Sequence, residues 1–378
     1  MIKVLSVFGT RPEAIKMAPL VKKLEEDTSI ESIVAVTAQH REMLDQVLNL
    51  FDITPNFDLD IMKPNQDLYD VTTKVLLGLR DVIKSCKPDI ILVHGDTTTC
   101  FAAALAAFYQ QIKIGHVEAG LRTGDLYAPF PEEANRSLVG QIATLHFAPT
   151  NTSKNSLLAE GIAPEKIYVT GNTVIDALLT VREKLSNYDA KNFAPQLPSN
   201  VIDKIINKPS KLILITGHRR ENFGQGFISL CEALATIAKD HPDWLLVYPV
   251  HLNPNVQKPV NELLGNINNI FLVPPQDYLP FAWLLDQCDL VITDSGGIQE
   301  EAPSLGKPVL VTRNVTERPE AVEAGTVKLV GTSKESIIEQ TTQILTNEAL
   351  YKQMSETHNP YGDGAASGRI VDAIKANF

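Results

Sequence analysis

Cysteine is scarce in this sequence. The 378 residues include only four cysteines, and none of them forms a CxxC pair: Cys86, Cys100, Cys231 and Cys288. Disulfide-rich scaffolds and cysteine zinc sites both need cysteines at close and regular spacing. We therefore expect neither, because scattered thiols are typical of a protein in the reducing cytoplasm.

Positive charge is also in deficit. The chain has 34 Lys and Arg residues against 45 Asp and Glu residues, which gives a formal net charge of -11. Such a chain repels a nucleic-acid backbone unless a local basic stripe overcomes the repulsion, and we find no Lys/Arg stripe with interleaved aromatic residues. We expect no nucleic-acid partner.

Long hydrophobic runs are missing. The longest apolar stretch, 101–109, is about half of the roughly 20 residues that a membrane-spanning helix needs. Near the amino terminus, the apolar run 4–8 is too short for the core of a signal peptide, and we expect it to form a first strand. These features predict a cytoplasmic protein without a membrane partner.

Two phosphate-binding fingerprints are absent as well. No GxGxxG follows the expected first strand, and GxxxxGK[ST] occurs nowhere in the chain. These patterns mark the dinucleotide-binding loop and the P-loop. Their absence argues against a nicotinamide-dependent dehydrogenase and a P-loop kinase, and we expect no cofactor.

What is present is a repeated alternation of strand and helix. Short apolar runs are each followed by an amphipathic or Ala-rich segment, which is typical of parallel βαβ units. In the first half of the chain the expected strands are 4–8, 33–36, 90–93, 112–117, 145–148 and 167–170, followed by a helix at 174–184. In the second half they are 212–216, 245–249, 270–273, 290–293, 309–312 and 327–330, with a helix at 227–239.

The two halves predict two domains, since the chain is more than twice the roughly 150 residues of a typical single domain. Residues 186–200 have the polar, aperiodic composition of an exposed connector. We predict an α/β fold of two Rossmann-like, doubly wound domains around a cleft, at 1–172 and 173–360. Periodicity allows a last helix, 365–377 within the segment 361–378, to pack on either domain, and we expect the first.

In open parallel sheets, ligands bind beyond the carboxyl ends of the strands. After the first expected strand, Pro12 fits the first turn of a helix whose N-terminus offers N–H groups to an anion. Arg11 and Lys16 would add positive charge there. An ordinary capped helix start with solvated basic residues is the alternative.

Two carboxylates, Asp96 and Glu118, follow neighbouring expected strands. Acidic groups that converge on one cleft push their pKa values apart, so that one site holds a proton acceptor and a proton donor near neutral pH. A helix N-cap or a salt bridge would also explain either residue. The pairs His94 with Asp96 and His116 with Glu118 raise the question of a metal site, but no further His cluster completes a coordination sphere, and we expect no metal.

Two further segments carry charge at expected helix or strand ends. Glu132 and Arg136, four residues apart, share one face of a helix and would bring a third carboxylate and another cation to a ligand, although capping explains one acidic residue equally well. In the second half, His218 stands beside Arg219 and Arg220. This combination favours binding or protonating a phosphate, and an exposed basic turn is the alternative.

A second phosphate-binding segment follows a later strand. Ser295, Gly296 and Gly297 lie between that strand and a helix, where backbone amides can approach a diphosphate closely. One turn into the helix, Glu301 is placed to accept hydrogen bonds from ribose hydroxyls, and Arg318 after the next strand would add positive charge.

Taken together, these segments resemble a known family, the non-hydrolysing bacterial UDP-N-acetylglucosamine 2-epimerases. The resemblance runs essentially from Lys3 to the last helix. It rests on these blocks: GTRPEAIK at 9–16, HGDTT at 94–98, GHVEAGLRT at 115–123, PEEANR at 131–136, GHRREN at 217–222, DSGGIQEEAPSLGKP at 294–308 and ERPE at 317–320.

The resemblance implies a glycosyltransferase-B-like fold, usually in a homodimer, and an isomerase reaction. UDP-GlcNAc loses UDP by anti elimination to give 2-acetamidoglucal, and UDP adds back to give UDP-ManNAc, which supplies ManNAc for a cell-surface polysaccharide. The catalytic positions of the family fall on Asp96, Glu118, Glu132 and His218. The nucleotide-sugar site falls on Arg11, Lys16, Asp96, Glu118, His218, Gln276, Phe281, Ser295, Gly296, Gly297, Glu301 and Arg318, to which the helix-face argument adds Arg136.

Members of this family are also activated by a second UDP-GlcNAc bound beside the active site. Gln39, Glu42, Arg219 and His251 match that region, while Asn65 and Glu42 stand where some members carry Arg and Gln. The resemblance therefore extends to an allosteric site with these departures.

Chemistry agrees with the resemblance, because removing a C2 proton needs a carboxylate base and a departing diphosphate needs cations and amide donors. Which carboxylate serves which face of the sugar stays open. Rival hypotheses are a GT-B glycosyltransferase with a UDP-sugar donor, a hydrolysing epimerase that releases ManNAc, and a nucleotide-sugar sensor without activity. The three carboxylates argue against the sensor, since acidic groups do not help to bind a diphosphate.

Overall fold

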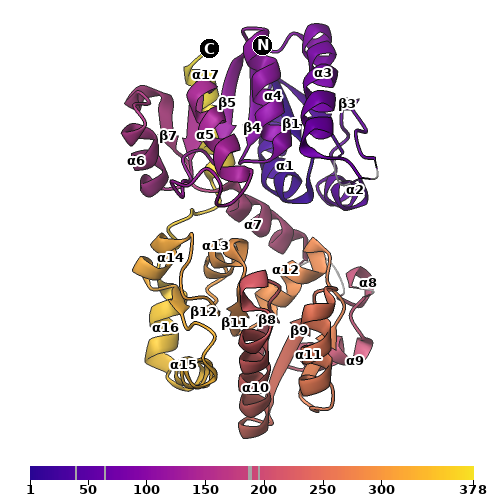
Figure 1. Ribbon diagram of the computed structural model, residues 1–378, viewed down its shortest axis with the longest axis vertical. Helices are drawn as coiled ribbons and strands as arrows, with labels where there is room; N and C mark the ends of the chain where they lie inside the picture. The colour runs from indigo at the N-terminus through magenta and orange to yellow at the C-terminus, as the bar shows by residue number, and fades with distance from the viewer. Residues whose placement is uncertain (39–40, 64, 186–189, 195) are drawn as a thin grey trace. The chain divides into compact units, whose positions relative to one another are not determined.

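The computed structural model describes residues 1–38, 41–63, 65–185, 190–194 and 196–378. The chain divides into two compact units, the first formed by Met1–Ala177 together with Tyr361–Phe378 and the second by Leu178–Pro360. Helix α7 (Thr173–Leu185) begins in the first unit and runs into the second (Figure 1). Each unit is built around a sheet of its own.

The first unit contains seven parallel strands in the order β3-β2-β1-β4-β5-β6-β7. The order reverses between β1 and β4, and such a switch point is where open α/β sheets bind ligands. The other elements of the unit, in chain order, are β1 (Ile2–Phe8), α1 (Arg11–Glu26), β2 (Ile30–Val36), α2 (Arg41–Leu50), β3 (Phe57–Asp58), α3 (Leu68–Cys86), β4 (Ile90–His94), α4 (Thr98–Tyr109), β5 (Lys113–Val117), α5 (Glu132–Ile142), β6 (Leu145–Ala148), α6 (Asn151–Ala159), η1 (Pro164–Lys166), β7 (Ile167–Val169) and α17 (Ala366–Ala376).

The second unit contains six parallel strands in the order β10-β9-β8-β11-β12-β13, which reverses between β8 and β11. This is the strand order of a Rossmann fold. Its elements are α8 (Ala190–Phe193), α9 (Ser199–Ile206), β8 (Lys211–Thr216), η2 (Arg220–Asn222), α10 (Gln225–Asp240), β9 (Trp244–Pro249), α11 (Pro254–Leu264), β10 (Ile270–Val273), α12 (Tyr278–Gln287), β11 (Leu290–Thr293), α13 (Gly296–Ser304), β12 (Val309–Val311), α14 (Pro319–Ala324), β13 (Val327–Leu329), α15 (Lys334–Thr346) and α16 (Glu348–Glu356).

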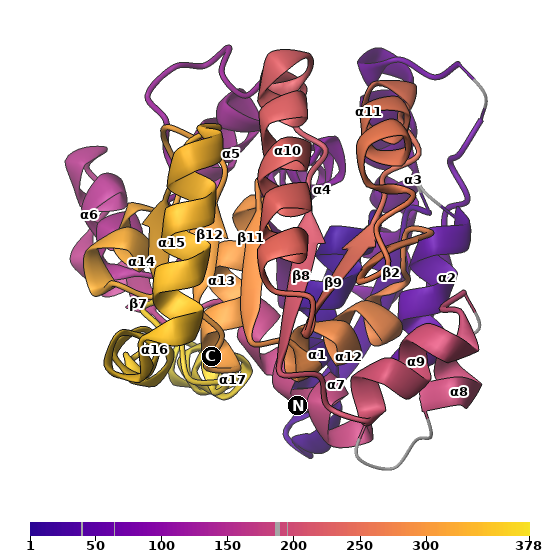
Figure 2. The same ribbon diagram turned by 90° about the horizontal axis from the view of Figure 1, so that it is seen from below.

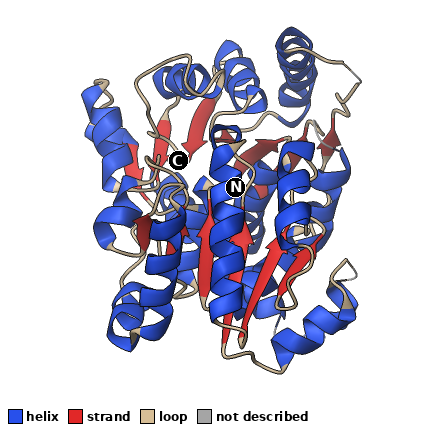
Figure 3. Cartoon of the chain, turned by 60° about the horizontal axis from the view of Figure 1, so that its bottom comes forward, coloured by secondary structure: helices blue, strands red, loops and turns tan. Residues whose placement is uncertain are grey.

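The central strands are buried on both faces. β4 and β11 are apolar almost throughout, and every residue of each is buried. This is expected of a parallel sheet that helices cover on both sides, and Figure 3 shows helices enclosing the strands of each sheet. In the second unit, for example, α10 packs against both α11 and α15 (Figure 2).

Threonine side chains start several of the helices that follow strands. Thr10, Thr97 and Thr150 are the N-caps of α1, α4 and α6, and each side-chain oxygen accepts a backbone N–H of the first turn. The small side chains of the Ala-rich α4 allow it to pack against the sheet and against α3 and α5. These caps fix where each helix leaves its strand, and so they set the shape of the loops at the strand ends.

The last helix packs within the first unit. α17 contacts α1, although the two helices lie near opposite ends of the chain (Figure 1). Asp176 accepts two backbone N–H groups at the start of α17, at 3.2 and 2.7 Å. Near the end of the helix, Lys375 pairs with Asp27 at 2.8 Å.

The predicted fold class, two α/β units with parallel, doubly wound sheets, is confirmed. The strands 145–148, 270–273 and 290–293 have the predicted bounds, and the others begin or end a few residues away, as β2 begins at Ile30 and not at residue 33. Among the described residues, no helix combines the length and apolar character needed to cross a membrane. All four cysteines are free.

In the part of the predicted connector 186–200 that the structure describes, exposed and buried residues alternate: Lys191, Gln196, Pro198, Ser199 and Asn200 are exposed. Ala190, Ala194 and Leu197 are buried, and α8 packs against both α9 and α12. A few apolar residues in a polar stretch are thus enough to anchor two short helices on the second unit. The two units divide earlier in the chain, inside α7.

Candidate active site

Three adjacent strands of the first unit, β1, β4 and β5, bring their carboxyl ends to one edge of the sheet. The chain leaves β1 through Gly9, where an added Cβ would lie 1.9 Å from the hydroxyl oxygen of Thr37 and 2.8 Å from that of Thr99. Only glycine fits so close an approach. The start of α1 therefore lies directly beside the start of α4.

Glu13 ties these two helix starts together. One of its carboxylate oxygens accepts the backbone N–H groups of Gly9 at 3.0 Å and Thr10 at 2.8 Å, and the other accepts from the Thr97 hydroxyl at 2.5 Å. Burial raises the pKa of Glu13, and these hydrogen bonds oppose the rise. Glu13 was not a predicted site residue, although the Thr-x-x-Glu spacing of a capping box is readable from the sequence. Arg11 lies in the first turn of the same helix and is partly exposed.

Glu118 is the most constrained of the predicted carboxylates. It follows β5 with a φ of 62°, a left-handed conformation that costs a non-glycine residue about 1–3 kcal/mol. Its Oε2 accepts hydrogen bonds from Lys16 Nζ and from Asn172 Nδ2, the latter at 2.8 Å. His94 Nε2 lies 3.8 Å from the same oxygen. Lys16 and Glu118 were both predicted; Asn172 was not, although it too follows a strand.

Asp96 follows β4 and forms an ion pair with Arg136 of α5, with Oδ2 and Nη2 2.7 Å apart. Asn135, from the same helix, donates its side-chain N–H to the Asp96 carbonyl at 2.8 Å. The N-cap of α4 is Thr97, so Asp96 has no capping role there. Two sequence predictions made separately, Asp96 and Arg136, thus meet in one contact.

Two other carboxylates, Glu118 and Glu132, act on Asp96 at this edge of the sheet. Burial raises the pKa of Asp96, Arg136 and Lys16 oppose the rise, and Glu118 and Glu132 add to it. Carboxylates that influence each other in this way are typical of sites that transfer protons near neutral pH.

The two acidic residues that open α5 have different roles. The buried Glu133 accepts the backbone N–H groups of Thr123 at 3.0 Å and Gly124 at 3.1 Å, so it anchors the loop that follows β5. Glu132 is partly exposed. Anchoring is therefore the role of Glu133, and Glu132 stays at the surface of the carboxylate cluster.

Two buried histidines support the same strand ends. His116 Nε2 lies 2.7 Å from the carbonyl oxygen of Gly95, and burial lowers the pKa of His116 to about 3. Burial lowers the pKa of His94 to about 4, against the attraction of Glu118. Both rings are therefore neutral near pH 7. Within the described ranges, no three His, Cys, Asp or Glu side chains are grouped as metal ligands.

In the second unit, His218 and Asp294 follow the adjacent strands β8 and β11. His218 Nδ1 lies 3.4 Å from Asp294 Oδ1. The His218 ring stacks on that of His251, with centroids 5.5 Å apart and an interplanar angle of 18°. Burial lowers the pKa of His218; Asp294 opposes this shift, and His251 and Arg219 add to it. Asp294 was not predicted as a site residue.

The start of α13 is the second predicted anion site. Ser295 is the N-cap, and Gly296 and Gly297 form the first turn. An added Cβ at Gly297 would meet nothing within 4 Å, and one at Gly296 would lie 3.8 Å from Glu317 Oε2 and 3.9 Å from Arg219 Nη2. The open helix N-terminus and the guanidinium favour an anion, because the helix dipole and the cation act together, and the Glu317 carboxylate beside them opposes it.

Three further predicted residues belong to the second unit: Gln276, Phe281 and Glu301. Glu301 is buried and accepts a hydrogen bond from the Tyr278 hydroxyl at 3.2 Å. Gln276 donates to the Pro274 carbonyl at 2.6 Å, while its buried Oε1 has no hydrogen-bond partner within the described part of the chain. Such an oxygen is costly to leave unsatisfied, which fits Gln276 as an acceptor for a ligand donor. Phe281 is partly exposed on α12.

Arg318 is engaged by a carboxylate. It is the N-cap residue of α14, and its guanidinium pairs with the buried Glu300 of α13. The nearby Arg313 is held by Glu221 at 2.6 Å and by Glu317 at 3.0 Å. A ligand phosphate that bound Arg318 would therefore share this cation with Glu300.

The residues assigned by resemblance to a second nucleotide-sugar site belong to both units. Gln39 lies outside the described residues. Glu42 is exposed in the first turn of α2, in the first unit. Arg219 and His251 belong to the second unit, where both adjoin His218.

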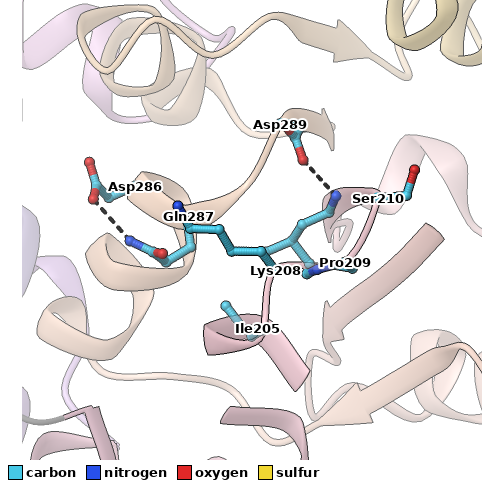
Figure 4. A pocket seen from close by; sticks show the side chains of 8 residues that line it. Ile205, Lys208, Pro209, Ser210, Asp286, Gln287 and Asp289 are labelled. Carbon is cyan, nitrogen blue, oxygen red and sulfur yellow. Dashed lines mark hydrogen bonds between the residues drawn. The ribbon is translucent and has the colours of Figure 1, made fainter. Parts of the chain in front are cut away.

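A cavity of about 270 Å³ lies at the opposite end of β8 and β11 (Figure 4). Lys208, Asp286 and Asp289 are among its lining residues. Asp289 accepts the backbone N–H of Leu212 at 2.7 Å. The described lining contains none of the predicted site residues, and ligands in this fold bind at the carboxyl ends of the strands. The candidate site is therefore at the other end.

Known proteins identify the family. A family model described as UDP-N-acetylglucosamine 2-epimerase matches residues 22–375. The chain is 59% identical over 376 residues to the UDP-N-acetylglucosamine 2-epimerase of Escherichia coli strain K12, covering 100% of this chain and 99% of that protein. This chain belongs to the UDP-N-acetylglucosamine 2-epimerase family. The resemblance stated from the sequence blocks is confirmed.

Solved structures of the family have the same fold. The UDP-GlcNAc 2-epimerase of Neisseria meningitidis, solved bound to UDP-GlcNAc, has a TM-score of 0.87 and 54% identity, covering 100% of both chains. A putative family member from Listeria monocytogenes has a TM-score of 0.92 and 50% identity, covering 100% of this chain and 96% of that one. The predicted GT-B-like class, with two Rossmann-like units, is confirmed, and the family is one of epimerases, which are isomerases.

Replacing His116 by Gln should change how stability depends on pH. An unfolded histidine has a pKa of 6.5, whereas burial lowers that of His116 to about 3. Below pH 6.5 the unfolded chain therefore binds a proton that the folded chain does not, and this histidine reduces stability as the pH falls toward 3. Gln does not titrate but still offers an N–H to the Gly95 carbonyl.

The measurement is the free energy of unfolding in urea for both proteins. The free energy of unfolding of the Gln variant should rise relative to that of the wild type by up to about 1.4 kcal/mol for each pH unit below the unfolded pKa of histidine. A difference that stays constant from neutral pH to about pH 4.5 would contradict the neutral, buried state of His116.

Proposed function

We propose that this chain catalyses the reversible epimerisation of UDP-GlcNAc to UDP-ManNAc at C2 of the sugar, without hydrolysis. The observation that carries the proposal is that Asp96 and Glu118 follow the adjacent strands β4 and β5, while α5, which begins with Glu132, is joined to Asp96 through Arg136. Membership of the epimerase family supports it. The relative from Neisseria meningitidis, solved with UDP-GlcNAc, supports the choice of substrate.

The proposed reaction begins when a carboxylate removes the C2 proton. The electron pair of the C2–H bond forms a C1=C2 double bond, and the C1–O bond to the diphosphate breaks with its electron pair leaving on UDP. The intermediate is 2-acetamidoglucal. UDP then adds back to C1 while a proton reaches the opposite face of C2, which gives UDP-ManNAc without any oxidant or water.

The first unit supplies the proton-transfer groups in this proposal. Inversion at C2 needs proton exchange on both faces of the glucal, so more than one acid/base group is required. Burial raises the pKa of Asp96, which makes its carboxylate a stronger proton acceptor. Lys16 and Asn172 fix the orientation of Glu118 through their hydrogen bonds.

The second unit holds the departing UDP in this proposal. The backbone N–H groups at the start of α13 would bind the diphosphate, with Arg318 as the cation that it shares with Glu300, and charge-assisted hydrogen bonds of this kind stabilise a leaving anion. His218 would lie on the phosphate side. The unsatisfied oxygen of Gln276 and the carboxylate of Glu301 would take donors from the nucleoside.

One NMR experiment tests the function. Purified protein is incubated with UDP-GlcNAc in D2O, and the sugar resonances are followed. The proposal expects deuterium at C2 together with UDP-ManNAc. Free ManNAc would indicate a hydrolysing epimerase, and retention of the C2 proton without an acceptor would indicate a glycosyltransferase; either result contradicts the proposal.

Asp96→Asn should abolish C2 exchange while UDP still binds. The amide keeps the size of the side chain but cannot accept the proton, so exchange should fall by at least about 100-fold. UDP binding, measured by calorimetry, should change little. Asp363→Asn is the matched control, because Asp363 also pairs with an arginine of the first unit, Arg369, but at the surface. Retained exchange in the Asp96 variant would remove this residue from the mechanism.

We further propose a homodimer formed through α3, α4 and α5. These helices pack side by side, and they expose Leu77, Phe108, Tyr109 and Leu138. Large apolar side chains gathered on adjacent helices favour an interaction surface. A second copy of the chain carries the same surface, so a two-fold pairing would cover both copies at once.

Phe108→Glu should convert the dimer to a monomer, because it places a charge within the proposed interface. The measurement is the molar mass in solution by light scattering. Leu263→Glu is the control, because Leu263 lies on α11 of the second unit, outside the proposed interface. Its exposure is similar to that of Phe108, 40% against 52%. A monomeric wild type, or a dimeric Phe108 variant, would contradict this interface.

We also propose that UDP-GlcNAc activates the reverse reaction from a second site, to which the second unit contributes Arg219 and His251. The stacking of His251 on His218 supports it, because a ligand on His251 would act directly on the ring beside it. The rate of UDP-ManNAc consumption should rise when UDP-GlcNAc is added. A hyperbolic rate curve without activation would contradict this proposal.

A cytoplasmic location is the last element of the proposal. The four free cysteines support it, because extracytoplasmic compartments favour disulfides. Recovery of the protein from an extracytoplasmic fraction would contradict it.

A further inference from the structure

Asp294 is a buried carboxylate that the proposed reaction does not use. It follows β11, and its side chain is 1% exposed. Its Oδ2 accepts the backbone N–H groups of His218 and Arg219, both at 2.9 Å. Asn222 adds a longer contact to the same oxygen at 3.4 Å. This oxygen therefore fixes the main chain of the loop that carries His218.

The other oxygen of Asp294 faces the His218 ring. Within the described ranges Oδ1 has no hydrogen-bond partner, although it is buried. The His218 Nδ1 atom lies 3.4 Å away. A buried carboxylate oxygen without a donor is costly, and an N–H on Nδ1 is the donor that a small rotation of the ring would supply.

The position of the two side chains then determines where the other ring nitrogen points. Asp294 is buried and the His218 side chain is 44% exposed. With Nδ1 toward the buried carboxylate, Nε2 lies on the exposed side of the ring. The other groups that face His218 are His251, whose ring is stacked on it, and the cation of Arg219.

We propose that Asp294 is a positioning residue that holds His218 with its Nδ1–H toward the carboxylate and its Nε2 toward the substrate. This inference rests on the proposed function, in which His218 lies beside the diphosphate. The neutral ring carries its proton on Nδ1, and once Nε2 has also taken up a proton from solvent, its N–H would donate a hydrogen bond to the diphosphate oxygen on which charge develops as the C1–O bond breaks. A carboxylate that accepts from the opposite nitrogen both fixes the tautomer and stabilises the charged ring.

Asp294→Asn tests the proposal. The amide oxygen can still accept the two backbone N–H groups, but its NH2 group then faces Nδ1 and makes this nitrogen an acceptor. Protein labelled with 15N at histidine shows by NMR which ring nitrogen carries the proton, and His218→Gln identifies the signal among the eight histidines. We expect the Nδ1–H tautomer in the wild type, the Nε2–H tautomer in the variant, and a lower pKa of His218 in the variant.

Kinetics supply a second readout. In the Asp294 variant, kcat for epimerisation should fall by roughly tenfold or more, while KM for UDP-GlcNAc should change little. Asp289→Asn is the matched control. Asp289 immediately precedes the same strand, β11, and it also accepts a backbone N–H of β8, that of Leu212, at 2.7 Å. It lines the cavity of Figure 4, whose described lining contains no histidine. The control should keep the kinetics and the His218 tautomer of the wild type.

Several results would overturn the proposal. They are an Nε2–H tautomer of His218 in the wild type, an unchanged tautomer and pKa in the Asp294 variant, or an equal fall of kcat in the Asp289 control. The wild-type spectrum decides the orientation even if the variant does not fold. The tautomer is measured without substrate, so the two proposals can fail independently. A wild type that lacks C2 exchange would overturn the proposed function, and the NMR spectrum would still decide the orientation of His218.

Discussion

Buried carboxylates at the carboxyl ends of parallel strands are the constraint on which the rest of this structure depends. A carboxylate removed from water is stable only where cations, hydroxyls or backbone N–H groups replace the water. Glu13, Glu118 and Asp294 meet this requirement with donors from distant parts of the chain. The contacts that stabilise these charges are therefore also the contacts that hold the strand-end loops in place.

This arrangement divides the chemistry between the two units of the proposed enzyme. In the first unit, burial and the neighbouring carboxylates Glu118 and Glu132 raise the pKa of Asp96, and shifted pKa values of this kind are typical of groups that move protons. The second unit presents an open helix start, a guanidinium and a histidine, which are groups that bind an anion. An elimination that separates a C2 proton from a diphosphate needs both kinds of environment.

Sequence alone predicted the strands well because parallel, two-sided burial produces continuous apolar runs. It also selected Asp96 and Arg136, but their pairing depends on the packing of α5, which no local pattern records. Asp294 was missed for the same reason, since its partners lie about 75 residues earlier in the chain. In the described part of 186–200, the polar composition indicated the exposed residues but not the burial of Ala190, Ala194 and Leu197, which depends on packing within the second unit.

The central claim is that the C1–O bond of the nucleotide sugar breaks and re-forms while both fragments stay bound. Positional isotope exchange tests it most directly: UDP-GlcNAc carrying 18O in the bridge between C1 and the β-phosphorus is incubated with the protein, and 31P NMR follows the label. The account predicts that the label moves from the bridge to the non-bridging oxygens of the β-phosphate at least as fast as UDP-ManNAc forms. Epimerisation with the label retained in the bridge would contradict the account.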